Sequence, residues 1–156
     1  SVVLLLAVGC GGEPPDKEMQ QAQGALDAAR AAGADKYATD EYEAAQLALT
    51  HSREAVDARD YRLALSHALD SRERAQSAAK MAADGMATAR VEADRALTAA
   101  ENAVAQAATR LEAARTAKVP ARLLTAPAAA IDTARTGVQE ARAQFDRGDY
   151  LSVPSR

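Results

Sequence analysis

The chain has 156 residues, enough for one ordinary domain or two small helical units. Hydrophobic residues make up 48% but aromatic residues only 3%, because alanine dominates; alanine forms helices well and buries little area, so we expect long helices with thin cores. The charge of −3 comes from 19 basic and 22 acidic residues that are interspersed. Such a balance argues against a nucleic-acid partner or a polybasic membrane surface.

An apolar run opens the chain from Val2 to Val8, and Gly9 and Cys10 follow it. This arrangement resembles the end of a bacterial lipoprotein signal, in which a diacylglycerol is joined to the cysteine and cleavage makes it the new N-terminus. The run is too short to span a membrane, which takes about 20 apolar residues, but it suits a signal core of roughly 7–15. We therefore expect residues 1–10 to be a signal sequence that is truncated at its start and ends at lipidated Cys10. The alternative is a frayed apolar end with an incidental thiol.

Residues 11–16 are rich in glycine and proline and predict a flexible tether behind Cys10. In the best-studied Gram-negative pattern, an aspartate after the cysteine retains a lipoprotein in the inner membrane. Gly11 stands there instead, so the resemblance implies a lipid anchor in the outer membrane, facing the periplasm. A single cysteine also excludes an internal disulfide framework.

The first predicted helix covers residues 16–32, with Asp16 as its N-cap and Gly33 just after its end. A loop at 34–38 should follow. The seam of this helix repeats every three or four residues at Met19, Ala22, Leu26 and Ala29.

A second helix is predicted to begin with Thr39 or Asp40 as its cap and to end near Ala58. Residues 59–61 then form a tight turn in which Asp60 caps the next helix. The second seam consists of Tyr42, Ala45, Leu49, Ser52 and Val56.

A third helix has no proline from Tyr61 to Lys118 and could reach roughly 80 Å. Gly85 is its expected bend or break, since glycine costs about 1 kcal/mol against alanine. Its first stripe contains Tyr61, Ala64, Ala68, Ala75, Ala82, Met86 and Ala89. Its second stripe contains Ala93, Leu97, Ala100, Val104, Ala107, Leu111 and Ala114.

After Pro120, residues 122–126 are expected to form a loop, and Pro127 to lie in the first turn of a fourth helix. A tight turn at 148–149 would lead into a fifth helix beginning at Tyr150. The fourth seam contains Ile131, Ala134, Val138, Ala141 and Phe145.

The chain also repeats itself. Residues 26–33 match residues 111–118, and the seam of the second helix matches that of the fourth. The Asp-Tyr pair at 60–61 returns at 149–150. Alanine-rich helices match easily by chance, but the ordered set of helix, loop, seam and turn predicts a duplication, with repeats at 17–92 and 93–156. The second repeat lacks its third helix, either because that helix was lost or because the sequence is cut short. We expect that the sequence is cut short.

Here the chain resembles a family of bacterial alanine-rich helical lipoproteins of unknown function, which combine a lipidated cysteine with a helical hairpin and an Asp-Tyr turn. The matching residues are Gly33, Ala34, Tyr37, Ala38, Glu41, Tyr42, Ala45, Leu49 and the run from Arg59 to Ala64. The Asp-Tyr turn also looks like a tetratricopeptide junction, but the period of 34 residues is missing.

No catalytic pattern is recognisable, so we expect no enzymatic activity, no cofactor and no catalytic residue. His51 and His67 lie symmetrically about Arg59, which should bring them to a similar height on an antiparallel hairpin, both facing outward. A metal site would want further ligands nearby, and none is expected.

Tyr42 and Tyr61 flank the first hairpin, and Tyr150 marks the second turn. The candidate partner contacts are Tyr37, Tyr42 and Tyr61. In the structural interpretation, the tyrosine rings close the turns by packing over small alanines. In the functional interpretation, they contact a partner.

Together these features predict an all-α protein of elongated antiparallel helical hairpins, a coiled-coil-like bundle with one very long helix. The favoured function is a membrane-anchored, non-enzymatic scaffold or spacer of the cell envelope, which self-associates or binds a protein through its alanine-rich seams. The alternatives are an adaptor that binds a protein or peptide between its hairpins, and a lipid-binding amphipathic bundle.

Overall fold

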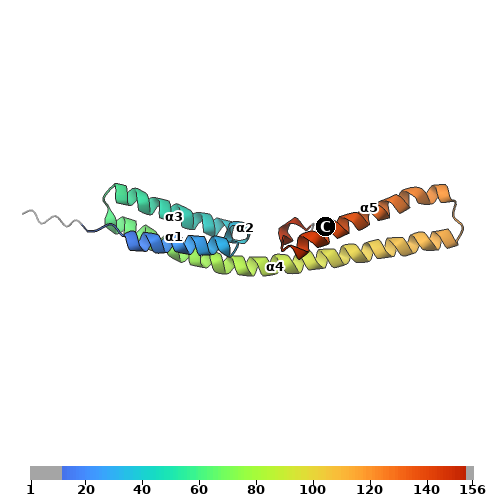
Figure 1. The fold of residues 1–156 in the computed structure, drawn as a ribbon, viewed down its shortest axis with the longest axis horizontal. Coiled ribbons are helices and arrows are strands. Elements are labelled where there is room, and N and C mark those ends of the chain that lie inside the picture. The colour runs from blue at the N-terminus through green and yellow to red at the C-terminus, as the bar shows by residue number, and fades with distance from the viewer. Residues whose placement is uncertain (1–11, 154–156) are drawn as a thin grey trace, which may run out of the picture. The chain divides into compact units, whose positions relative to one another are not determined.

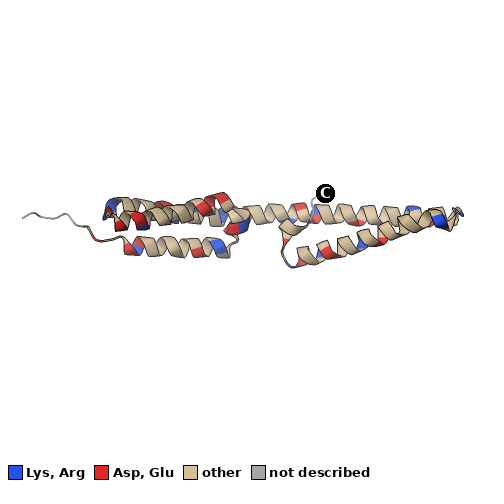
Figure 2. Ribbon diagram, turned by 90° about the horizontal axis from the view of Figure 1, so that it is seen from above, with Lys and Arg blue, Asp and Glu red and all other residues tan. Residues whose placement is uncertain are grey.

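The computed structural model describes residues 12–153, and this part of the chain is all α-helical, as predicted (Figure 1). It contains no strand within those residues. The elements are α1 (Asp16–Ala31), α2 (Ala34–Tyr37), α3 (Thr39–Asp57), α4 (Tyr61–Thr116), α5 (Ala121–Asp146) and the 3-10 turn η1 (Tyr150–Ser152). The very long helix is therefore α4, with 56 residues. Basic and acidic residues are interspersed along the helices rather than gathered at one end of an element (Figure 2).

The chain divides into two compact units, unit 1 (Ser1–Gly85) and unit 2 (Met86–Arg156). The dividing point lies inside α4, so one helix supplies residues to both units. The repeat boundary expected after residue 92 falls in the same helix, a little further along.

Unit 1 is a bundle of α1, α3 and the first part of α4, in which α3 runs antiparallel to the other two (Figure 1). Three larger side chains in its core are those of Leu26, Tyr42 and Leu49. Seven further members of this core cluster have no exposed surface and are all alanines, namely Ala22, Ala29, Ala34, Ala45, Ala75, Ala78 and Ala82. Because alanine has only a methyl group, the helix backbones approach closely and the core is thin, as the composition predicts.

Two buried serines join α3 to α4. The hydroxyl of Ser52 donates to the carbonyl oxygen of Ala64 at 2.7 Å, and the hydroxyl of Ser71 donates to the carbonyl oxygen of Ala45 at 2.8 Å. Both side chains are fully enclosed. A buried hydroxyl is tolerated only with a partner, so these reciprocal bonds fix the register of the two helices.

Gly85 does not interrupt α4, contrary to the expected break. A Cβ at this position would lie 2.9 Å from the carbonyl oxygen of Tyr37 and 3.2 Å from its Cβ. The glycine therefore lets the backbone of α2 pass close to α4. Gly85 therefore marks a place where two backbones pack closely, and not a break in the helix.

Four helix ends carry a residue in the left-handed conformation, at Gly33, Arg59, Lys118 and Gly148. The N–H that follows Arg59, Lys118 and Gly148 bonds in each case to the carbonyl oxygen five residues earlier, as in a Schellman motif. Gly33 has the role predicted for it. The two pairs, Gly33 with Lys118 and Arg59 with Gly148, are separated by the 85 and 89 residues at which the sequence matches itself.

Of the N-cap residues predicted for the first three long helices, only the one before α4 is correct. The Oδ1 of Asp60 accepts a hydrogen bond from the N–H of Leu63 at 3.0 Å and so caps α4. Asp16 is instead the first residue of α1, because Pro15 occupies the N-cap position. Neither Thr39 nor Asp40 caps α3.

The start of α3 is set by the segment before it. The residues expected to be a loop form the short helix α2, whose last N–H groups bond to the carbonyl oxygen of Gly33. Ala38 follows α2, is buried and occupies the N-cap position of α3. The buried Ala38 thus stands where a polar N-cap was predicted, and it is the single residue between α2 and α3.

Unit 2 is an antiparallel hairpin of α5 and the later part of α4, closed at one end by η1 (Figure 1). Its small core contains Ala93, Leu97 and Val153, with Phe145 and Tyr150 packed against it. The rings of Phe145 and Tyr150 meet edge to face, with centroids 5.2 Å apart.

Two expectations for unit 2 are wrong. Helix α5 begins at Ala121, so the predicted loop at 122–126 is helical and Pro127 lies inside the helix. The extra turn carries the half-buried Leu124, whose burial favours helix over loop. The segment after Asp149 is a single 3-10 turn that ends in an extended Val153, and not the start of an α-helix within the described residues.

Candidate functional site

Cys10, the predicted lipidation site, lies outside the described residues. The described chain starts at Gly12, and α1 begins at Asp16. A methyl group added at Gly12 would lie 4.0 Å from Cδ2 of Tyr61, so the segment before α1 passes beside the start of α4. Among residues 12–153, no helix is both long enough and apolar enough to cross a membrane.

The three tyrosines singled out as partner contacts do not form one surface. Tyr42 is 6% exposed and belongs to the core of unit 1, and Tyr37 is half-buried against the same core. Tyr61 is half-buried at the first residue of α4, at the end of unit 1 opposite α2 (Figure 1). The structural interpretation therefore accounts for Tyr42 fully, and only parts of Tyr37 and Tyr61 remain accessible.

His51 and His67 come together across α3 and α4, as their spacing predicted. Their ring centroids are 5.4 Å apart with a tilt of 59°. Both are half-buried, which is less exposed than the outward orientation expected. Within residues 12–153, no group of three His, Cys, Asp or Glu side chains is placed to hold a metal ion.

Ion pairs connect the helices on their exposed sides. Arg74 of α4 lies 3.0 Å from Asp70 on its own helix and 3.4 Å from Glu41 of α3. The hydrogen bond to Asp70 and the two negative charges raise the pKa of the Arg74 guanidinium. In unit 2, Arg142 of α5 lies 2.6 Å from Glu101 of α4, and this bond raises the pKa of Arg142. The Arg74–Glu41 and Arg142–Glu101 pairs each link two neighbouring helices.

Unit 2 carries two grooves along its hairpin, and both include Val104 and Val138. One groove, of about 380 Å³, is lined by Ala96, Leu97, Ala100, Ala103, Val104, Ala134, Gly137, Val138, Ala141 and Val153. We call it the alanine groove, since no charged side chain lines it. The other, which we call the charged groove, is lined by Glu101, Val104, Ala105, Arg135, Val138 and Gln139. One groove is therefore lined without charged side chains, and the other includes Glu101 and Arg135.

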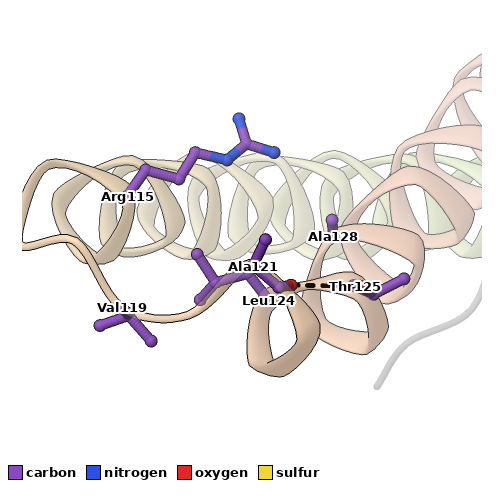
Figure 3. A pocket seen from close by; sticks show the side chains of 6 residues that line it. All are labelled: Arg115, Val119, Ala121, Leu124, Thr125 and Ala128. Carbon is purple, nitrogen blue, oxygen red and sulfur yellow. Dashed lines mark hydrogen bonds between the residues drawn. The ribbon is translucent and has the colours of Figure 1, made fainter.

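A third pocket, of about 370 Å³, lies where α4 passes into α5 (Figure 3). Arg115 extends from α4 on one side, with Val119 and Leu124 on the other. Arg115 is held by Glu112 at 3.2 Å, and Thr125 donates to the carbonyl oxygen of Ala121 at 3.2 Å. The polar groups of this pocket are thus used within their own helices, which favours a structural role.

Comparison with protein-family models, with curated proteins and with solved structures finds no match to this chain.

The alanine groove is the functional candidate that sequence reasoning missed. The sequence periodicity identifies its seam residues and predicts self-association or partner binding through such seams, but it does not identify the groove beside them. The available signal was a second alanine stripe on α4, displaced from the seam, which includes Ala96, Ala99 and Ala103. One helix with two alanine stripes can contact two neighbours.

Proposed function

We propose that this chain is a lipid-anchored, non-enzymatic lipoprotein of the bacterial cell envelope, attached through Cys10 and acting as a helical scaffold or spacer. The observation that carries the proposal is the apolar run Val2–Val8 with Gly9 and Cys10 directly before a helical unit. Only residues 11–15 separate the anchor from α1, so a lipid on Cys10 would hold unit 1 close to the membrane surface.

The helical units support the scaffold role in their construction. Their helices are held by alanine seams, buried serine bonds and ion pairs, all of which serve packing. A thin, regular core presents long helix faces to other molecules, as helical repeat modules do. The adaptor alternative draws no specific support from the tyrosines, because Tyr42 is buried and Tyr61 lies apart from Tyr37.

Lipidation is tested directly by producing the chain, preceded by a short basic segment, in a Gram-negative host fed with labelled palmitate. We expect the label on the wild-type chain and its recovery in the membrane fraction. The matched control is Cys10→Ser, which removes the only thiol and should abolish both. An unlabelled wild-type chain, or equal labelling of Cys10→Ser, would contradict the proposal.

The membrane of residence has a separate test. The proposal assigns the anchor to the periplasmic face of the outer membrane because Gly11 follows the cysteine. Gly11→Asp should move the lipidated chain to the inner-membrane band of a density gradient, and Gly11→Ser should leave it in the outer membrane. Recovery of the wild-type chain in the inner membrane would overturn this assignment while leaving the lipid anchor intact.

A further inference from the structure

Corresponding positions of the two units differ in burial. Ala45, Leu49 and Ser52 of α3 are at most 2% exposed, because α1 and α4 enclose them. The repeat places these three residues on Ala134, Val138 and Ala141 of α5, all of which line the alanine groove and none of which is buried. In unit 1 a third helix covers this face. Within residues 86–153 of unit 2, no third helix covers the same face.

A stripe along α4 borders this open face. Its members recur at intervals of four and three residues and are all exposed or half-buried, namely Glu92, Ala96, Ala99, Ala103, Gln106 and Arg110. Ala96 and Ala103 also line the alanine groove. This spacing is that of a helix seam, and its central alanines permit close approach of another helix.

The two ends of the stripe carry opposite charges. Glu92 and Arg110 are 18 residues apart, which is about five helical turns, so both point to the same side of α4. If two such stripes pack antiparallel, Glu92 of one copy lies opposite Arg110 of the other, and the two-fold axis repeats the pair. A parallel arrangement would instead place like charges together.

We infer that the alanine groove and the α4 stripe form the interface of an antiparallel homodimer, in which unit 2 of a second copy takes the place that a third helix has in unit 1. The face is self-complementary in charge, which is what a two-fold interface requires. Ala99 of one copy then faces Ala103 of the other across the axis, where only small side chains fit. The two hairpins together make a four-helix bundle.

This inference goes beyond the lipid-anchored scaffold, because it depends on unit 2 alone and holds with or without a lipid. Its test uses the full chain with Cys10→Ser, so that neither a lipid nor a disulfide can link two copies. Palmitate labelling and dimerisation are read in different assays. Failure of one is therefore distinguishable from failure of the other.

Charge reversal tests the orientation. In sedimentation equilibrium we expect a dimer whose dissociation constant rises about tenfold with Glu92→Arg or with Arg110→Glu, because each change creates two repulsive pairs. The double variant should return to the wild-type value, since it exchanges the two charges. The matched control is Glu140→Arg on an exposed position of α5, which should change nothing. A double variant as weak as the single variants would overturn the antiparallel interface.

Bulk tests the location. Ala103→Arg places a long side chain in the alanine groove and should leave the chain monomeric, whereas Ala105→Arg places it in the charged groove and should leave the dimer unchanged. Both positions are exposed, so circular dichroism should report the same helix content for both variants. A wild-type chain that stays monomeric, or a dimer that survives Ala103→Arg, overturns the proposal and leaves the groove to a different helix.

Discussion

Units 1 and 2 are built from the same pattern of seams and turns but are enclosed to different degrees. In unit 1, α1, α3 and α4 surround a common row of alanines, and two serine hydroxyls are sealed inside. In unit 2, α4 and α5 enclose a small cluster around Leu97 and leave a groove beside it. The comparison teaches that an alanine seam specifies where helices touch, while the number of helices present decides which alanines become core.

The largest expected effect is a difference in unfolding free energy between the same substitution made at corresponding positions of the two units. Ala45 has no exposed surface, whereas its counterpart Ala134 is exposed. Ala45→Leu should lower the free energy of unfolding by about 1–3 kcal/mol or more, because the added atoms push α3 away from its neighbours. In the monomer, below the dissociation constant of any dimer, Ala134→Leu should stay within about 0.5 kcal/mol. Urea unfolding followed by circular dichroism measures both, and equal losses would mean that the two faces are covered alike.

Glycine positions provide the next test of close packing within unit 1. Gly85→Ala should lower stability by about 1 kcal/mol, because the clash with the Tyr37 carbonyl outweighs the gain in helix propensity. Gly24 lies inside α1, with no atom of a neighbour within 4 Å of an added Cβ. Gly24→Ala should therefore raise stability by about 1 kcal/mol. Thermal unfolding of the two variants must shift in opposite directions, and a gain with Gly85→Ala would refute the close approach.

An effect of similar size is expected at the two serine bonds of unit 1. Unit 2 has Ala141 at the position that corresponds to Ser52. Ser71→Ala removes the donor to the Ala45 carbonyl and should cost about 1 kcal/mol. Ser66→Ala changes an exposed serine of the same helix and supplies the control for helix propensity. If urea midpoints of both variants coincide, the buried hydroxyl contributes nothing to holding α3 on α4.

The sequence predicted the helices well because periodicity and alanine content depend on local chemistry. The long α4, the left-handed Gly33 and the Asp60 cap all follow from patterns within a few residues. What failed depended on tertiary contacts: Gly85 was interpreted without Tyr37, and Pro127 without the half-buried Leu124. Ser71 fits the small-residue stripe of α4 but was overlooked, because a hydroxyl counts as polar until its buried partner is known.

The candidate sites show the same limit. The spacing of His51 and His67 predicted their proximity, since a hairpin with a tight turn fixes equal heights on both helices. The sequence could not show which tyrosines are buried and which are accessible. A helical period of 3.6 residues does not distinguish a ring that fills a core from one that faces a partner. Lipidation at Cys10 stays a prediction.

The smallest expected effect concerns the turns that both units share. Arg59 ends α3 in a left-handed conformation that its repeat counterpart, Gly148, adopts without strain. Arg59→Gly should therefore raise the free energy of unfolding by a few tenths to about 1 kcal/mol, because the backbone strain is larger than the entropy that glycine adds to the unfolded chain. Gly148→Arg makes the reverse exchange in unit 2 and should lower stability by a similar amount. Opposite shifts of matching size in urea midpoints would show that the two turns are energetically equivalent, and a loss with Arg59→Gly would mean that the arginine side chain supports its turn.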